Sequence, residues 1–171
     1  MDTYIDLRDV RLTGFASQGL IALVAAESVW GTVNDWSGGS STWSFLAQVF
    51  YVPAAVAFVL WFRNATHNAE AIALHGVRMI NDVWRASDPS QRSKPFKERT
   101  VSPLIRPWQY AFLAMVLTDL LETLLLDTGA YVVFSTLSTI SAVVAAGLAC
   151  FLIWRISWMQ QQFAVPRAKR R

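Results

Sequence analysis

Residues 45–62 read FLAQVFYVPAAVAFVLWF and include Gln48 but no charged side chain. Residues 138–153, STISAVVAAGLACFLI, are also free of charge. A helix in a soluble bundle alternates polar and apolar faces, and neither stretch does so. A hydrocarbon core of about 30 Å is crossed by about 20 helical residues, which is close to the length of both stretches. They therefore predict membrane-spanning helices.

Two further apolar stretches of similar length complete the pattern. The predicted helices cover residues 15–33, 43–62, 108–126 and 130–154, with a loop at 63–107 and a basic tail at 159–171. The chain has 171 residues, 54% of them apolar, and a length of this kind corresponds to about one domain. We predict an all-α membrane protein in which residues 1–171 form a single domain, a four-helix transmembrane bundle.

Basic residues fall on one side of these four stretches. All 15 Lys and Arg residues lie before the first stretch, in the 63–107 loop, or at and beyond the end of the fourth stretch. This is the distribution that the positive-inside rule produces when a chain crosses a membrane an even number of times. It predicts a multi-pass protein of a bacterial inner membrane with both termini in the cytoplasm. The mixed charge of residues 1–12 favours a retained first helix over a removable signal peptide.

The 63–107 loop has two parts. Between residues 64 and 86, apolar side chains recur at three- and four-residue spacing, which predicts an amphipathic in-plane helix on the cytoplasmic face, or a continuation of the second helix. Residues 87–107 contain four prolines and predict an irregular connector. The basic residues of the loop and tail predict contact with anionic lipid headgroups or a partner: Arg63, Arg78, Arg85, Arg92, Lys94, Lys97, Arg99, Arg106, Arg167, Lys169, Arg170 and Arg171.

Three carboxylates lie inside the apolar stretches: Glu27, Asp119 and Glu122. A charge at the bilayer centre costs about 2.5–3.5 kcal/mol, so these groups should face the bundle interior. No basic residue shares their depth, whereas hydroxyls of the fourth stretch do: Ser135, Ser138 and Thr139. One interpretation is a proton or cation site. The other is neutral carboxyls that hold helices together through hydrogen bonds worth about 1 kcal/mol each.

Small residues recur every four positions in the fourth stretch: Ser138, Ala142, Ala146 and Cys150. Such a row lets another helix approach closely, either within this chain or from a partner. Cys150 is the single cysteine, so no internal disulfide can form. His67 is a weak candidate for a metal, haem or pigment ligand, and a surface histidine is the simpler interpretation. We predict no metal and no cofactor other than bound lipid.

No phosphate-binding loop, nucleophile elbow or metalloprotease pattern occurs in the sequence, so we expect no enzymatic activity. The basic loop has no recognised nucleic-acid motif, and we expect no nucleic-acid partner.

Three motifs carry a resemblance to a known family. Residues 58–72, FVLWFRNATHNAEAI, end the second predicted helix, and residues 79–89, MINDVWRASDP, follow in the loop. Residues 151–162, FLIWRISWMQQQ, end the fourth helix. Together they resemble the bacterial membrane family catalogued as domain of unknown function 4328, although the segment between the first two motifs is shorter here. The resemblance implies a membrane bundle over most of the chain and implies no activity.

Two functions remain open from the sequence. The first is a non-catalytic accessory or interaction subunit that packs against partner membrane proteins, a second copy, or anionic lipid. The alternative is a small proton- or cation-linked transporter or channel that uses the intramembrane carboxylates.

Overall fold

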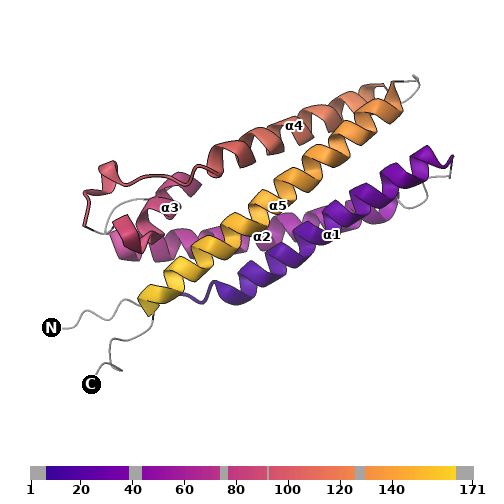
Figure 1. The fold of residues 1–171 in the computed structure, drawn as a ribbon. Coiled ribbons are helices and arrows are strands. Elements are labelled where there is room, and N and C mark those ends of the chain that lie inside the picture. Colours follow the sequence, from indigo (N-terminus) through magenta and orange to yellow (C-terminus); the bar gives the residue numbers. More distant parts are fainter. Residues whose placement is uncertain (1–6, 39–43, 74–76, 92, 126–129, 165–171) are drawn as a thin grey trace.

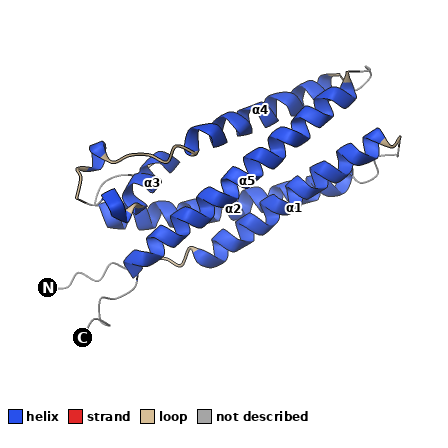
Figure 2. Cartoon of the chain, viewed as in Figure 1, coloured by secondary structure: helices blue, strands red, loops and turns tan. Residues whose placement is uncertain are grey.

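The computed structural model describes residues 7–38, 44–73, 77–91, 93–125 and 130–164, and these form helices joined by loops, with no strand among them (Figure 2). Four helices are long: α1 (Arg11–Trp36), α2 (Ser44–Ala73), α4 (Ile105–Leu124) and α5 (Tyr131–Ala164). A short helix, α3 (Ile80–Ser87), and two 3-10 turns, Pro89–Gln91 and Phe96–Glu98, lie between α2 and α4. The prediction of an all-helical chain is confirmed.

Three of the described helices are long and apolar enough to cross a membrane, namely α1, α2 and α5. Helix α4 falls outside this set, because Asp119, Glu122 and a polar first turn lower its mean hydropathy. By length and composition these three helices indicate a membrane protein, and α4 is the helix whose crossing needs a separate argument.

The long helices run side by side, and the molecule has two distinct ends (Figure 1). At one end α1 begins, α5 finishes and α3 is packed, and we call this the α3 end. At the other end α1 leads toward α2 and α4 leads toward α5, and we call this the hairpin end. Every described Lys and Arg lies at or near the α3 end, in keeping with the one-sided charge of the sequence.

Helix α5 is central, because it packs along α4 on one side and along α1 on the other, while α2 packs along α1. Helices α2 and α4 have little direct packing, although the rings of Phe58 and Trp108 approach to 6.5 Å between centroids. The four long helices therefore form an open arc in the order α4, α5, α1, α2. The sequence predicted a bundle but gave no indication of this order.

The 64–86 segment is not one amphipathic helix. Helix α2 continues to Ala73, and a separate α3 begins at Ile80, where the backbone of Met79 is extended (φ −125°, ψ 160°). Helix α3 packs against α2 and α5 and buries Val83, Trp84, Ala86 and Ser87. The predicted continuation of the second helix is thus correct for residues 64–73. The end of α2, helix α3 and the last turns of α5 therefore form a packed cap at this end of the molecule, rather than a single surface helix.

Large buried side chains gather at the α3 end. Trp61, Val83, Ile105, Leu152 and Ile156 are each no more than 1% exposed and belong to one cluster. Toward the hairpin end the buried positions of α5 are instead small residues, including Ser135, Ser138, Ala142 and Ala145. The best-packed core thus lies where the basic residues lie. The remaining lengths of the long helices expose many aliphatic side chains, as a lipid-facing surface does.

Candidate functional site

Helices α1 and α5 are joined near the hairpin end by a ladder of side-chain hydrogen bonds. Asp35 Oδ2 accepts hydrogen bonds from the Tyr131 hydroxyl at 3.0 Å and from Ser135 Oγ at 3.2 Å. One turn away, the hydroxyls of Thr32 and Thr139 are hydrogen-bonded to each other. Polar pairs of this kind each contribute about 1 kcal/mol between helices in a membrane. The ladder therefore fixes the pairing of α1 with α5.

Two further contacts extend the ladder. Thr139 Oγ1 also donates a hydrogen bond to the Ser28 carbonyl oxygen of α1 at 3.2 Å. Trp36 Nε1 donates to Thr136 Oγ1 at 3.1 Å. The hydroxyls predicted to surround intramembrane acids are thus engaged mainly with α1. The sequence analysis missed Asp35 because it was assigned to the turn after the first helix. Its spacing from Ser28 and Thr32, at positions i, i+4 and i+7, was the signal that could have revealed it.

The three predicted acids come from two helices. Glu27, on α1, and Glu122, on the face of α4 that is turned to α5, are half-buried, whereas Asp119 is exposed. Glu122 lies beside Tyr131 and Ser135, and all three acids are near enough to the Tyr51 hydroxyl for their charges to act on it, without a hydrogen bond to it. The structure therefore brings the acids into one neighbourhood at the hairpin half, with Asp119 at its open edge.

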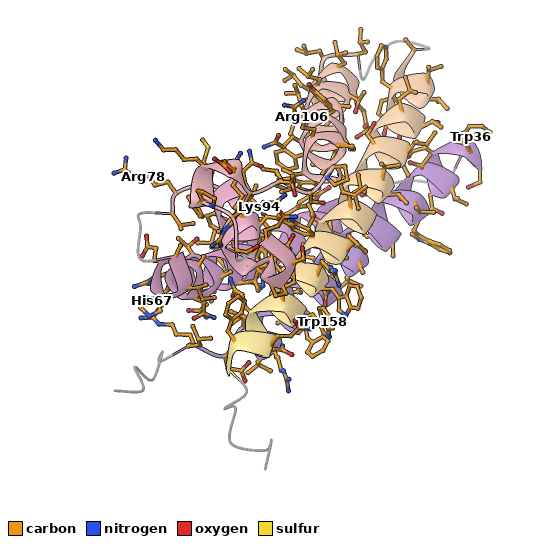
Figure 3. All side chains as sticks on the ribbon, turned by 60° about the vertical axis from the view of Figure 1, so that its left-hand side comes forward. Trp36, His67, Arg78, Lys94, Arg106 and Trp158 are labelled. Carbon is orange, nitrogen blue, oxygen red and sulfur yellow. The ribbon has the colours of Figure 1, made fainter. Side chains whose placement is uncertain are left out.

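The neighbourhood is not arranged as a metal site. Within the described residues no group of three or more His, Cys, Asp and Glu side chains is placed to hold a metal ion. His67, the weak candidate ligand, is exposed on α2 near the α3 end (Figure 3).

The row of small residues on α5 lies within the chain's own packing. Ser138 and Ala142 are buried, and Ala146 and Cys150 are half-buried. The Cys150 carbonyl oxygen accepts a hydrogen bond from Gln18 Nε2 at 2.8 Å, and Cys150 Sγ lies 3.7 Å from the Gln18 carbonyl oxygen. This row therefore receives α1 at close range at its Cys150 end.

The predicted headgroup contacts differ in exposure. Arg63, Arg78, Lys94, Lys97 and Arg106 are exposed, and Figure 3 shows three of them at separate points of the α3 end. Five others lie outside the described residues: Arg92, Arg167, Lys169, Arg170 and Arg171.

Arg85 and Arg99 are half-buried and have partners within the chain. Arg85 lies 3.9 Å from Asp82. Arg99 donates to the carbonyl oxygens of Lys94 and Arg85, and its guanidinium lies over the Phe96 ring. These two therefore also hold the connector in place.

A buried polar network at the α3 end joins the three segments on which the family resemblance rests. Asn68 Oδ1 accepts from the Arg8 backbone N–H at 2.8 Å, and its Nδ2 donates to the Arg8 carbonyl at 2.9 Å and to Gln160 Oε1 at 3.2 Å. Gln160 Nε2 donates to the Ala65 carbonyl and to Ser87 Oγ, each at 2.9 Å. The network thus joins four segments of the chain. These are the residues just before α1, and the helices α2, α3 and α5.

Both amides of this network are 1% exposed, and their donors and acceptors are satisfied. A buried network of this completeness fixes one arrangement of its elements, because any other leaves polar atoms unpaired. Beside it, Trp61 Nε1 donates to Ser157 Oγ at 3.0 Å between α2 and α5. The sequence analysis predicted none of these contacts.

Comparisons of this chain with models of protein families, with well-described proteins and with solved structures found no significant match. The resemblance to domain of unknown function 4328 therefore rests on the three motifs alone and stays a prediction.

Proposed function

We propose that this chain is a non-catalytic integral subunit of a bacterial inner membrane that packs against a partner membrane protein and anionic lipid. In this proposal all four long helices cross the bilayer, and both chain ends, with the cap around α3, are cytoplasmic. The single observation that carries it is the outer face of α4. That face is apolar and exposed, and the carboxylate of Asp119 lies on its flank.

The position of α4 supports its crossing. Helix α2 finishes at the α3 end and α5 begins at the hairpin end, so the chain must travel the length of the molecule between them. Helix α4 makes this passage in 20 residues, which span about 30 Å and match a hydrocarbon core. If α1, α2 and α5 cross in the orientation in which they pack, α4 crosses with them.

The face of α4 that is turned away from α5 supports a protein partner. Leu113, Leu117, Leu120 and Leu124 are 51–70% exposed on this face, and Asp119 is exposed on the flank of the helix between this face and Glu122. Lipid tails suit the leucines but offer no hydrogen bond to a carboxyl group. A charge near the bilayer centre costs about 2.5–3.5 kcal/mol, and a polar group on a neighbouring helix removes much of that cost.

The test is photo-crosslinking in intact cells, with a photoreactive amino acid at Leu117 or Leu120 and a control at Val59, an exposed position of α2. We expect a discrete protein adduct from the α4 positions, and its loss when Asp119→Leu is added. An adduct of twice the chain's mass would identify the partner as a second copy. Adducts to lipid alone from every position would refute the protein-partner part of the proposal.

A second candidate is a proton- or cation-linked transporter, favoured by the grouping of Glu27, Asp119 and Glu122 around Tyr51. Proteoliposomes containing a pH-sensitive dye would test it. Flux that disappears with Asp119→Asn and with Glu122→Gln, and persists with the exposed Glu70→Gln, would support transport. A wild-type chain that carries neither protons nor alkali cations would exclude it.

A further inference from the structure

A cleft of about 270 Å³ lies between the beginning of α1 and the last turns of α5, at the α3 end. The α1 wall presents Arg11, Phe15 and Gln18, and Gly14 lies between them. A side chain at Gly14 would meet Ser157 Oγ at 3.2 Å, so the glycine lets the two walls approach closely at the floor. This cleft belongs neither to the polar ladder nor to the outer face of α4.

The α5 wall presents polar and aromatic groups in alternation. Ser157 and Gln161 line the cleft together with Trp154 and Trp158, which are 49% and 43% exposed. Ser157 Oγ accepts the hydrogen bond of Trp61, so its own O–H is left to donate. The side-chain amide of Gln161 has no hydrogen bond to another described residue and is free to bind a ligand.

Charge in and around the cleft is positive. Arg11 is the one cation of the lining, its guanidinium has no acidic partner among the described residues, and no carboxylate lines the cleft. The Arg155 guanidinium lies 4.9 Å from the centre of the Trp158 ring and adds positive charge at the rim. Asp9, whose Oδ1 accepts the backbone N–H of Arg11 at 2.8 Å, does not line the cleft.

The depth of the cleft matches a lipid headgroup. Indoles favour the boundary between water and hydrocarbon, and Trp158 projects outward at the end of α5 (Figure 3). Phe15 is 67% exposed on the neighbouring helix. The cleft therefore combines a cation and polar donors with an apolar border, as an amphiphile requires.

We propose that this cleft binds the headgroup of one anionic phospholipid. Its phosphate accepts hydrogen bonds from Arg11, Ser157 and Gln161, and its acyl chains lie along Phe15 and Trp154 toward the hairpin end. Free phosphate would contact a single cation, and it has no apolar part to contact the aromatic border. The lining therefore favours a lipid over free phosphate. The inference rests on the proposed membrane location and is independent of any protein partner at α4.

The experiment measures lipid retention by native mass spectrometry. Delipidated protein in detergent is titrated with phosphatidylglycerol, with phosphatidylcholine and with inorganic phosphate. We expect one phosphatidylglycerol to be retained per wild-type chain at concentrations where phosphatidylcholine is not. Arg11→Gln should weaken retention by about fivefold, since a base near the membrane surface contributes about that much to binding of an anionic lipid. Gln161→Leu should also weaken it.

Arg8→Gln is the matched control, because Arg8 is an exposed arginine three residues earlier that does not line the cleft. We expect it to retain the lipid as the wild type does. Equal losses in both arginine variants would overturn the site in favour of diffuse surface charge. Equal retention of both lipids, or displacement by inorganic phosphate, would overturn it as well.

The variants also separate this inference from the proposed function. Arg11→Gln should leave the photo-crosslinks of α4 unchanged. Asp119→Leu should leave lipid retention unchanged. A loss of α4 crosslinks in Arg11→Gln would contradict the independence of the two sites.

Discussion

Asn68 and Gln160 face each other across 92 positions of sequence, and each amide satisfies the other as well as the backbone. A buried amide that loses its partner keeps its desolvation cost without the hydrogen bond, a penalty of about 1–3 kcal/mol. The pair therefore favours a single placement of α2, α3 and α5 at the α3 end. Together with the buried hydrogen bond from Trp61 to Ser157, this pair gives the cap a defined register.

Gln160→Leu should lower the stability of the folded chain by about 1–3 kcal/mol, because one N–H of Asn68 and the acceptor of Ser87 lose their partner. The fraction of protein that stays monodisperse after heating in detergent would measure the loss as a lower midpoint temperature. Gln162→Leu is the control, since Gln162 is exposed two residues further along α5. Equal midpoints for the two variants would show that the network has no role in stability.

Neither amide could be paired from the sequence. Asn68 and Gln160 lie in polar segments that follow apolar stretches, and periodicity gives no information on which segments meet. The predicted end of the second helix at residue 62 followed from the polar residues beyond it. Helix α2 continues to Ala73 because the Asn68 amide finds buried partners there.

At the scale of the elements, the contact of α1 with α5 combines small residues and hydroxyls. Near the hairpin end it is held by Asp35 and Thr32, and near the α3 end by the close approach at Gly14. Between them, the Gln18 amide binds the α5 backbone at Cys150. Helices in lipid gain little from apolar burial, so close packing and hydrogen bonds must fix their pairing. These contacts extend along nearly the whole of α1.

Gly14→Leu should destabilise the α3 end by about 1–3 kcal/mol, since overpacking at a tight contact forces neighbouring side chains to move. The new side chain would meet Ser157 Oγ at 3.2 Å and Trp61 Cδ1 at 3.4 Å, already at its Cβ atom. Gly19→Leu is the matched control, because nothing lies within 4 Å of a Cβ there. We expect a lower midpoint temperature for Gly14→Leu alone, and a fall of equal size in Gly19→Leu would contradict the packing argument.

The elements could be predicted far better than their contacts. Long charge-free stretches determine helices of membrane length, and four of the described helices overlap the predicted ranges. The predicted acids do lie on long helices, but Asp35 was missed because a polar residue near a Gly- and Ser-rich segment resembles a turn. The arc order of the helices depends on side chains that are distant in sequence, which composition alone does not determine.

At the scale of the whole molecule, chemistry is divided between the two ends. The described basic residues, the large-residue core and the amide network lie at the α3 end, while the carboxylates Glu27, Asp35, Asp119 and Glu122 lie in the hairpin half. Helix α5 spans about 51 Å at 1.5 Å per residue, which exceeds a hydrocarbon core of about 30 Å. In the proposed membrane placement, its last turns extend beyond the hydrocarbon into the cap, which lies on the water-exposed side.

This division predicts which residues can be labelled from each side of the membrane. In a Cys150→Ala background, single cysteines replace Ser37 at the hairpin end and Ser93 and Gln162 at the α3 end, all three exposed. A membrane-impermeant maleimide should label Ser37→Cys in intact spheroplasts, and the other two only after permeabilisation. Basic residues favour the cytoplasmic side of a membrane, so the α3 end should be protected from outside labelling and the hairpin end should be accessible to it.

The same three cysteine variants distinguish the possible topologies. If α4 crosses the membrane, α5 finishes on the side where α1 begins, and if α4 does not cross, α5 finishes on the other side. If α4 crosses, Ser93→Cys and Gln162→Cys are protected together, as their shared position at the α3 end requires. If α4 does not cross, the two are labelled from opposite sides, and the packing of α5 against the beginning of α1 cannot exist in the membrane. Labelling of Ser93→Cys and Gln162→Cys in intact spheroplasts, with Ser37→Cys protected, would keep the helix arrangement but reverse the orientation that the basic residues predict.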